Sequence, residues 1–129
     1  MRNGGSIGGM ENRIVMGSLN QKPLVGLESL ADGALAEVVA ELEPGQEESL
    51  VLFRDGQAVR AWLNVCPHAG RRLDWAPGQF LKSRDGHLVC AAHGASFELG
   101  GGQCVAGPCR GESLRQVAVE VRDGQLWLA

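Results

Sequence analysis

Three Asp-Gly pairs that each follow an arginine occur along the chain, at residues 55–56, 85–86 and 123–124. Asp-Gly suits the type I′ turn, whose two central residues need positive φ, so each pair predicts the tip of a β-hairpin. Glycine and proline together make up nearly a fifth of the 129 residues, which favours short strands and tight turns over long helices. The sequence therefore predicts an all-β fold.

The residues around the first and third pairs have the composition of strands. The predicted strands cover residues 49–53, 58–65, 116–121 and 125–128. Val117, Val119 and Val121 alternate onto one face, which indicates a half-buried antiparallel sheet. Residues 34–42 are ambiguous, because Ala, Leu and Glu favour a helix while the Pro-Gly pair that follows limits the length of the segment. We expect a strand there, and a short helix is the alternative.

The size and charge of the chain predict one soluble domain. Its 129 residues are 44% hydrophobic and 21% charged, near the average for globular proteins. The net charge is -3 and no run of five or six Lys/Arg occurs, which argues against binding to nucleic-acid phosphates.

No stretch approaches the ~18 apolar residues of a membrane span, and the N-terminus lacks the apolar segment of a signal peptide. We expect a cytoplasmic protein with no nucleic-acid or membrane partner, and a disordered lead at residues 1–12.

Two short clusters carry residues that suit a metal site. They read C-P-H-A-G at residues 66–70 and C-A-A-H-G at residues 90–94, and each follows a predicted strand. The candidate ligands are Cys66, His68, Cys90 and His93. Two thiols and two imidazoles complete a four-ligand set, and the glycine after each pair lets the backbone bend closely around a bulky group. Zinc fingers place both cysteines in one loop and both histidines on a helix, so their order does not fit.

The pattern C-x-H-x-G followed by C-x-x-H-G resembles the signature of the Rieske iron-sulfur family. The resemblance extends to Leu73, Ala95-Ser96-Phe97, the glycine run at residues 100–102 and Gly107-Pro108. It implies a Rieske-like antiparallel β sandwich with a small cluster-binding subdomain formed by two loops. We expect a single Rieske domain at residues 13–129, with the cluster-binding subdomain at about residues 64–110.

The resemblance also implies the cofactor. By that resemblance, Cys66 and Cys90 would hold one iron of a single [2Fe-2S] cluster, and His68 and His93 would hold the other iron. Neutral imidazoles in place of two thiolates make the cluster less negative, so its reduction potential rises above that of an all-cysteine ferredoxin.

Departures from the respiratory-chain members of the family predict a low potential within the Rieske range. Those proteins carry an extra cysteine in each ligand loop, and the two form a disulfide; the matching positions here are Arg71 and Ala92. They also have a Ser and a Tyr whose hydroxyls bond to the cluster region, where this chain has Ala95 and Phe97. Fewer hydrogen bonds to the cluster stabilise its reduced state less.

Other residues near the motifs have weaker signals. We expect Cys104 and Cys109 to be free thiols, and the alternative is that they pair or have a redox role. Arg71 and Arg72 either flank a docking surface for a partner or belong to an ordinary solvated loop. The three tryptophans are expected to pack in the core or against loops, with Trp75 beside Pro77 shielding the cluster; they are Trp62, Trp75 and Trp127.

A Rieske centre serves either an electron carrier or a terminal oxygenase, which also needs an iron held by two histidines and a carboxylate. Once His68 and His93 are assigned to the cluster, only His87 remains, so this chain cannot supply that second site. A nucleotide-binding fingerprint and the length for a flavin domain are also lacking. The resemblance therefore implies a monomeric one-electron carrier, not an enzyme, between a flavin-dependent reductase and a terminal oxygenase. The alternatives are a small accessory subunit of a nitrite-reductase-like oxidoreductase and a structural zinc-binding interaction module.

Overall fold

The computed structural model describes residues 22–67, 70–92 and 94–129, so the predicted lead at residues 1–12 lies outside the described residues. Its strands are β1 (Val25–Gly26), β2 (Leu35–Glu43), β3 (Gln46–Asp55), β4 (Ala58–Leu63), β5 (Leu81–Lys82), β6 (Leu88–Val89), β7 (Ser96–Phe97), β8 (Cys104–Ala106), β9 (Gln116–Val117), β10 (Val119–Arg122) and β11 (Gln125–Leu128). A 3-10 turn, η1 (Leu27–Ser29), is the one helical element in this part of the chain. Within these ranges no helix is long and apolar enough to cross a membrane. The prediction of an all-β fold is confirmed.

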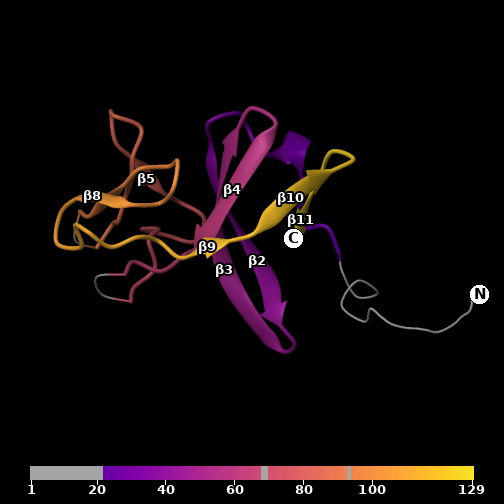
Figure 1. Cartoon of the computed structure of the whole chain (residues 1–129), viewed down its shortest axis with the longest axis horizontal. Coiled ribbons are helices and arrows are strands. Elements are labelled where there is room, and N and C mark those ends of the chain that lie inside the picture. Colours follow the sequence, from indigo (N-terminus) through magenta and orange to yellow (C-terminus); the bar gives the residue numbers. More distant parts are fainter. Residues whose placement is uncertain (1–21, 68–69, 93) are drawn as a thin grey trace, which may run out of the picture.

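Three antiparallel sheets lie side by side (Figure 1). The central sheet has the order β2-β3-β4-β9. The sheet β1-β11-β10 lies on one side of it, and the sheet β5-β6-β7-β8 lies on the other. The sheets β2-β3-β4-β9 and β1-β11-β10, which share one core, form the expected sandwich. The sheet β5-β6-β7-β8 forms a separate small layer.

Alternation along β3 and β4 gives the central sheet a buried face on each side. Val51 pairs with Trp62, and both side chains belong to the core shared with the β5-β8 layer. The next pair along, Leu52 with Ala61, belongs to the core shared with β10 and β11. All four side chains are at most 1% exposed. Because successive residues of a strand point to opposite faces, one hairpin therefore joins both cores.

The three Asp-Gly pairs that follow an arginine lie at hairpin tips, but only the third forms the predicted turn. Asp123 and Gly124 both have positive φ, 53° and 75°, as a type I′ turn requires. In the first hairpin Asp55 pairs with Ala58, so Gly56 is the first central residue and has a φ of 66°. Two contacts from outside the turn hold this register, because the Gly56 amide donates to Asp32 and its carbonyl accepts from Arg54.

The predicted strand over residues 116–121 is wrong as one element, because the chain divides it at Ala118. β9 pairs with β4 in the central sheet, whereas β10 pairs with β11 in the facing sheet. The three alternating valines still pack against the core between those sheets. The strand expected over residues 34–42 is β2, which covers Leu35–Glu43, because β3 supplies a hydrogen-bonding partner along its length.

A buried tryptophan sets how closely the turn at residues 100–102 approaches the central sheet. A Cβ added at Gly102 would meet Trp62 Nε1 at 2.5 Å, and the φ of Gly102 is 81°. Gly86 has nearly the same φ, 83°, with nothing within 4 Å of an added Cβ.

We predict that Gly102→Ala lowers the free energy of unfolding by about 2–5 kcal/mol, since left-handed strain and overpacking combine. Gly86→Ala is the matched control and should cost about 1–2 kcal/mol, from the strain alone. Urea unfolding followed by circular dichroism compares the two variants. Equal losses in both would mean that the contact with Trp62 has no energetic effect.

Candidate metal centre

The first cysteine motif forms a tight loop directly after β4. In loop 1, residues 66–71, the Cys66 amide donates to the Arg71 carbonyl at 2.6 Å. The Gly70 amide donates back to the Cys66 carbonyl at 2.8 Å, and Gly70 has a φ of 68°. The glycine after the motif is therefore needed for its left-handed conformation, which most side chains disfavour.

The second cysteine motif repeats this turn directly after β6. In loop 2, residues 90–95, the Cys90 amide donates to the Ala95 carbonyl at 2.7 Å. The Gly94 amide donates to the Cys90 carbonyl at 2.9 Å, and Gly94 has a φ of 75°. Both cysteines thus occupy the same position in two loops of the same hydrogen-bonding pattern.

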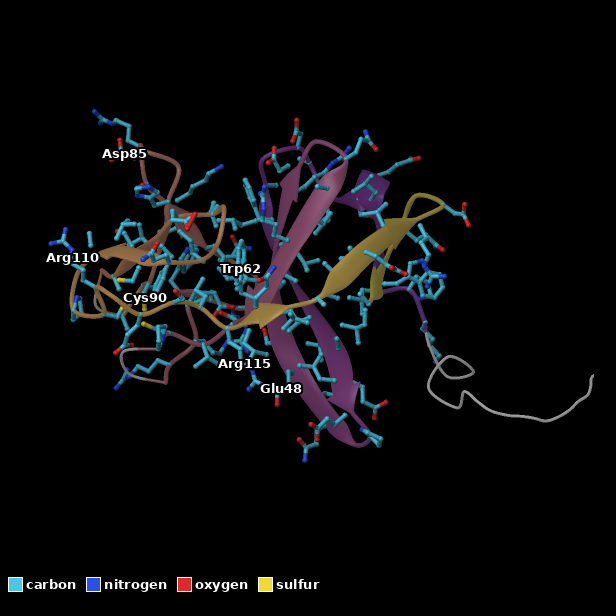
Figure 2. The ribbon with its side chains drawn as sticks, in the orientation of Figure 1. Glu48, Trp62, Asp85, Cys90, Arg110 and Arg115 are labelled. Atoms are coloured by element: carbon cyan, nitrogen blue, oxygen red, sulfur yellow. The ribbon has the colours of Figure 1, made fainter. Side chains whose placement is uncertain are left out.

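The two loops bring their cysteines into one buried cluster. Cys66 is 0% exposed and Cys90 is 1% exposed, and both belong to the core that contains Trp62. Figure 2 shows Cys90 within the small layer and Trp62 between that layer and the central sheet. The Ala91 amide donates to the Leu73 carbonyl at 3.2 Å and so links loop 2 to the segment after loop 1.

The outer residues of the same loops lie at the surface. The exposed residues are Gly70, Arg71, Ala91, Ala92 and Gly94. Among the described residues of the loops, the two cysteines therefore lie on the inner side, and small residues and Arg71 lie on the outer side. His68 and His93 lie outside the described residues, so the structure places the cysteine half of the predicted ligand set.

A buried asparagine ties loop 1 to the central sheet. Asn64 is 1% exposed, and its Oδ1 accepts a hydrogen bond from the Leu73 amide at 2.9 Å. Its Nδ2 donates to Ser49 Oγ at 3.1 Å and to Asp74 Oδ2 at 3.2 Å. Because Asn64 precedes loop 1 and its side chain bonds to Leu73 and Asp74 after the loop, it ties the two ends of the loop together.

An ion pair completes this support. Arg72 donates to both carboxylate oxygens of Asp74, at 3.0 and 2.8 Å, and to Glu37 on β2 at 2.7 Å. Burial acts to raise the pKa of Asp74, but hydrogen bonds from Arg72, Gly78 and Asn64 outweigh it and hold that pKa below its usual value. Hydrogen bonds from Ser49 and Arg72 likewise lower the pKa of Glu37. Sequence reasoning missed this network, since its members come from separate strands and loops.

The structure separates the two arginines that the sequence left undecided. Arg72 is bound by two carboxylates, whereas the Arg71 side chain makes no hydrogen bond or ion pair with the described residues and is exposed. Trp75, predicted to pack and to shield the cluster, is 60% exposed, so its predicted packing is wrong. A bond from its amide to the Gln79 carbonyl holds it in an outward turn, beside an open surface hollow that Arg71 also lines.

The remaining cysteines lie in the same buried cluster as Cys66 and Cys90. Cys104 and Cys109 are thiols, and the Cys109 Sγ donates to the Cys104 Sγ at 2.7 Å. Burial and the hydrogen bond with Cys104 raise the pKa of the Cys109 thiol to about 12. In the sequence, both cysteines lie outside the two motifs, and no sequence pattern indicates that the fold brings them into one buried cluster with Cys66 and Cys90.

We predict that Asp74→Asn lowers the free energy of unfolding by about 1–3 kcal/mol at neutral pH, because buried hydrogen bonds to a charged group are lost. The folded-state pKa of Asp74 is lowered. Its stabilisation is therefore complete above the unfolded-state pKa of about 3.9 and is lost as the pH falls through the folded-state value.

Urea unfolding of both proteins across acid and neutral pH should give a difference that shrinks only at the acid end. Asp85→Asn is the control, because Asp85 projects from an exposed hairpin tip away from the loops (Figure 2). A difference between wild type and Asp74→Asn that stays constant with pH would rule out the charge as its cause.

The model of the Rieske [2Fe-2S] domain matches residues 28–121. The chain belongs to the Rieske [2Fe-2S] domain family. This domain carries one [2Fe-2S] cluster, and the described residues fit it, since two buried sulfur donors lie at equivalent positions of two adjacent loops.

Individual relatives come from oxygenase and reductase systems. The chain is 36% identical over 107 residues to the oxygenase component of dicamba O-demethylase from Stenotrophomonas maltophilia, a match that covers 74% of this chain and 29% of that protein. The ferredoxin of carbazole 1,9a-dioxygenase from Nocardioides aromaticivorans IC177 has a similar fold, with a TM-score of 0.64, 22% identity and coverage of 84% of this chain and 96% of that one. A putative NADPH nitrite reductase small subunit gives a TM-score of 0.58 at 24% identity, covering 85% and 99%.

Proposed function

We propose that the chain is a one-electron carrier that passes electrons from a flavin-dependent reductase to a terminal oxygenase. The proposed cluster ligands are Cys66, His68, Cys90 and His93, with the two cysteines on one iron and the two histidines on the other. The observation that carries this proposal is the repeated turn of loops 1 and 2, which sets both cysteines in one buried cluster. When bound, the [2Fe-2S] cluster accepts and releases one electron.

The surroundings of the loops suit repeated electron transfer. Leu73, Leu88 and Phe97 are 0% exposed and belong to the buried cluster around the two cysteines, so they exclude water from the inner side of the site. Asn64 and the Arg72–Asp74 ion pair hold loop 1 in place. Ligands that are held this firmly move little when the charge of the site changes, which favours rapid exchange.

The outer face of the loops suits contact with a redox partner. Gly70, Ala91 and Gly94 are exposed and small, so a partner surface can approach the site closely. Arg71 adds an exposed cation, and Trp75 adds an exposed aromatic ring beside the same hollow. Arginine and tryptophan are enriched at interface hot spots, and the cation favours a partner surface that bears carboxylates.

The oxygenase partner is supported by the similarity to a ferredoxin of a dioxygenase over nearly the whole length of that protein. The chain spans 29% of the curated oxygenase component, and no second iron site is predicted from its remaining histidine, His87. A small subunit of a nitrite-reductase-like oxidoreductase is the second candidate, favoured by fold similarity over 99% of such a chain. Two measurements separate these roles: reduction of the purified protein by a flavin-dependent reductase, and its reoxidation by a terminal oxygenase. Both reactions are expected of the electron carrier and not of the reductase subunit.

We predict that the purified protein holds about two irons and two acid-labile sulfides per chain, with an EPR signal after dithionite reduction. Alanine at any one of the four proposed ligands should abolish that signal and the visible absorbance, because the cluster loses a bond. Cys104→Ser and Cys109→Ser are the matched controls and should keep both. Stoichiometric zinc without a reduced-state signal would instead favour the structural zinc module.

We predict a midpoint potential of about -150 mV, near the bottom of the Rieske range. Ala95 and Phe97 are 0% exposed in the buried cluster and provide no hydroxyl donor there. Protein-film voltammetry measures the value, and the double variant Ala95→Ser/Phe97→Tyr should raise it. Ala118→Ser adds a hydroxyl between β9 and β10 as the control and should leave it unchanged. A wild-type midpoint above about +200 mV would contradict the low-potential assignment.

A further inference from the structure

Two thiols outside the proposed ligand set are in direct contact. The Cys109 and Cys104 sulfurs lie 2.7 Å apart, and the residues are 1% and 3% exposed. A disulfide bond is about 2.05 Å long, so the sulfurs are already close to bonding distance. The Cys104 Sγ also donates to the Ala106 carbonyl at 3.3 Å, which holds its side chain toward the inside of the turn.

Backbone hydrogen bonds hold together the turn that contains both cysteines, without any covalent bond between the sulfurs. The Cys104 amide donates to the Glu112 carbonyl at 2.8 Å, and the Glu112 amide donates to the Cys109 carbonyl at 2.9 Å. Within the turn, the Arg110 amide donates to the Gly107 carbonyl at 3.3 Å. Since these bonds already hold the turn together, joining the sulfurs needs no rearrangement of the chain.

This turn supports loop 2 from behind. A Cβ added at Gly107 would meet the Ala95 Cα at 2.8 Å, so the two backbones are in close contact. Cys104 on β8 pairs with Phe97 on β7, the strand that leaves loop 2. The pair is therefore coupled to the backbone of loop 2 through both a strand pairing and a glycine contact.

We propose that Cys104 and Cys109 form an oxidisable dithiol that a hydroperoxide converts to a disulfide behind loop 2. One sulfur attacks the peroxide, so that an S–O bond forms, the O–O bond breaks and, with hydrogen peroxide, one water leaves. The second sulfur then attacks the sulfenic acid, the S–S bond forms, the S–O bond breaks and a second water leaves. The two electrons that reduce the peroxide come from the thiols, and their protons end in the waters.

A small oxidant suits the position of the pair. Both side chains are buried, but Ala106, Gly107, Pro108 and Arg110 on the same turn are exposed, so the pair is close to the surface. Hydrogen peroxide is nearly as small as water and needs only a local opening of this turn. The disulfide would join β8 to the end of the turn and keep Gly107 against Ala95.

The test treats the anaerobic, thiol-reduced holoprotein with stoichiometric hydrogen peroxide while the visible absorbance of its metal centre is recorded. Unfolding in the presence of iodoacetamide then labels every thiol. Cleavage after glutamate releases residues 99–112, which contain Cys104 and Cys109 and no other cysteine. We expect this peptide to carry two labels before oxidation and none after it, with a mass two hydrogens below that of the dithiol, and dithiothreitol should restore both labels.

Cys104→Ala and Cys109→Ala are the controls, and neither peptide should lose two hydrogens on oxidation. The proposal is overturned if the wild-type peptide keeps both labels, if either cysteine bonds to Cys66 or Cys90, or if the absorbance is lost before the disulfide appears. The peptide mass reads the thiols whether the protein holds iron or zinc, so failure of the electron-carrier proposal would be seen separately in the metal and sulfide content.

Discussion

The pairing of β3 with β4 is the interaction on which the rest of the structure depends. Its register sets the pair Val51 and Trp62 against one core and the pair Leu52 and Ala61 against the other. A slip of one residue would exchange these faces, so burial on both sides specifies the register strongly. Because β4 runs directly into loop 1, the same register fixes the position of Asn64 and Cys66.

The two cysteine loops have the same turn but different support. Loop 1 is held by polar groups, through Asn64 and the pairing of Arg72 with Asp74 and Glu37. Loop 2 is held by backbone contact with Gly107 and by the pairing of β7 with β8, the strand that carries Cys104. The first kind of support depends on charge and therefore on pH, whereas the second depends on close packing.

The two loops together have an inner side and an outer side. The inner side is apolar and closely packed, which suits a group that must change its charge without admitting water. The outer side has small exposed residues, the exposed cation of Arg71 and the exposed ring of Trp75. A protein that exchanges electrons with others needs both sides, since the site must be protected and still be approached closely.

The sequence by itself determined the all-β class, three of the hairpin tips, the family and both cysteine motifs. Each of these depends on local chemistry, because a glycine with positive φ or a ligand spacing is visible within a few residues. The turn type at Gly56 and the break at Ala118 were not predictable in this way, since contacts with Asp32, Arg54 and the facing sheet decide them.

Tertiary structure alone decided which residues support the loops and which face outward. Asn64 and Asp74 join because β4 and the segment after loop 1 fold back on each other, and no pattern along the chain encodes that meeting. Trp62 and Trp75 are the same residue type, yet one is 0% exposed and the other 60%. The turn that carries Cys104 and Cys109 lies against loop 2 for the same reason, because contact between separate segments depends on the packing of the sheets and on long-range hydrogen bonds.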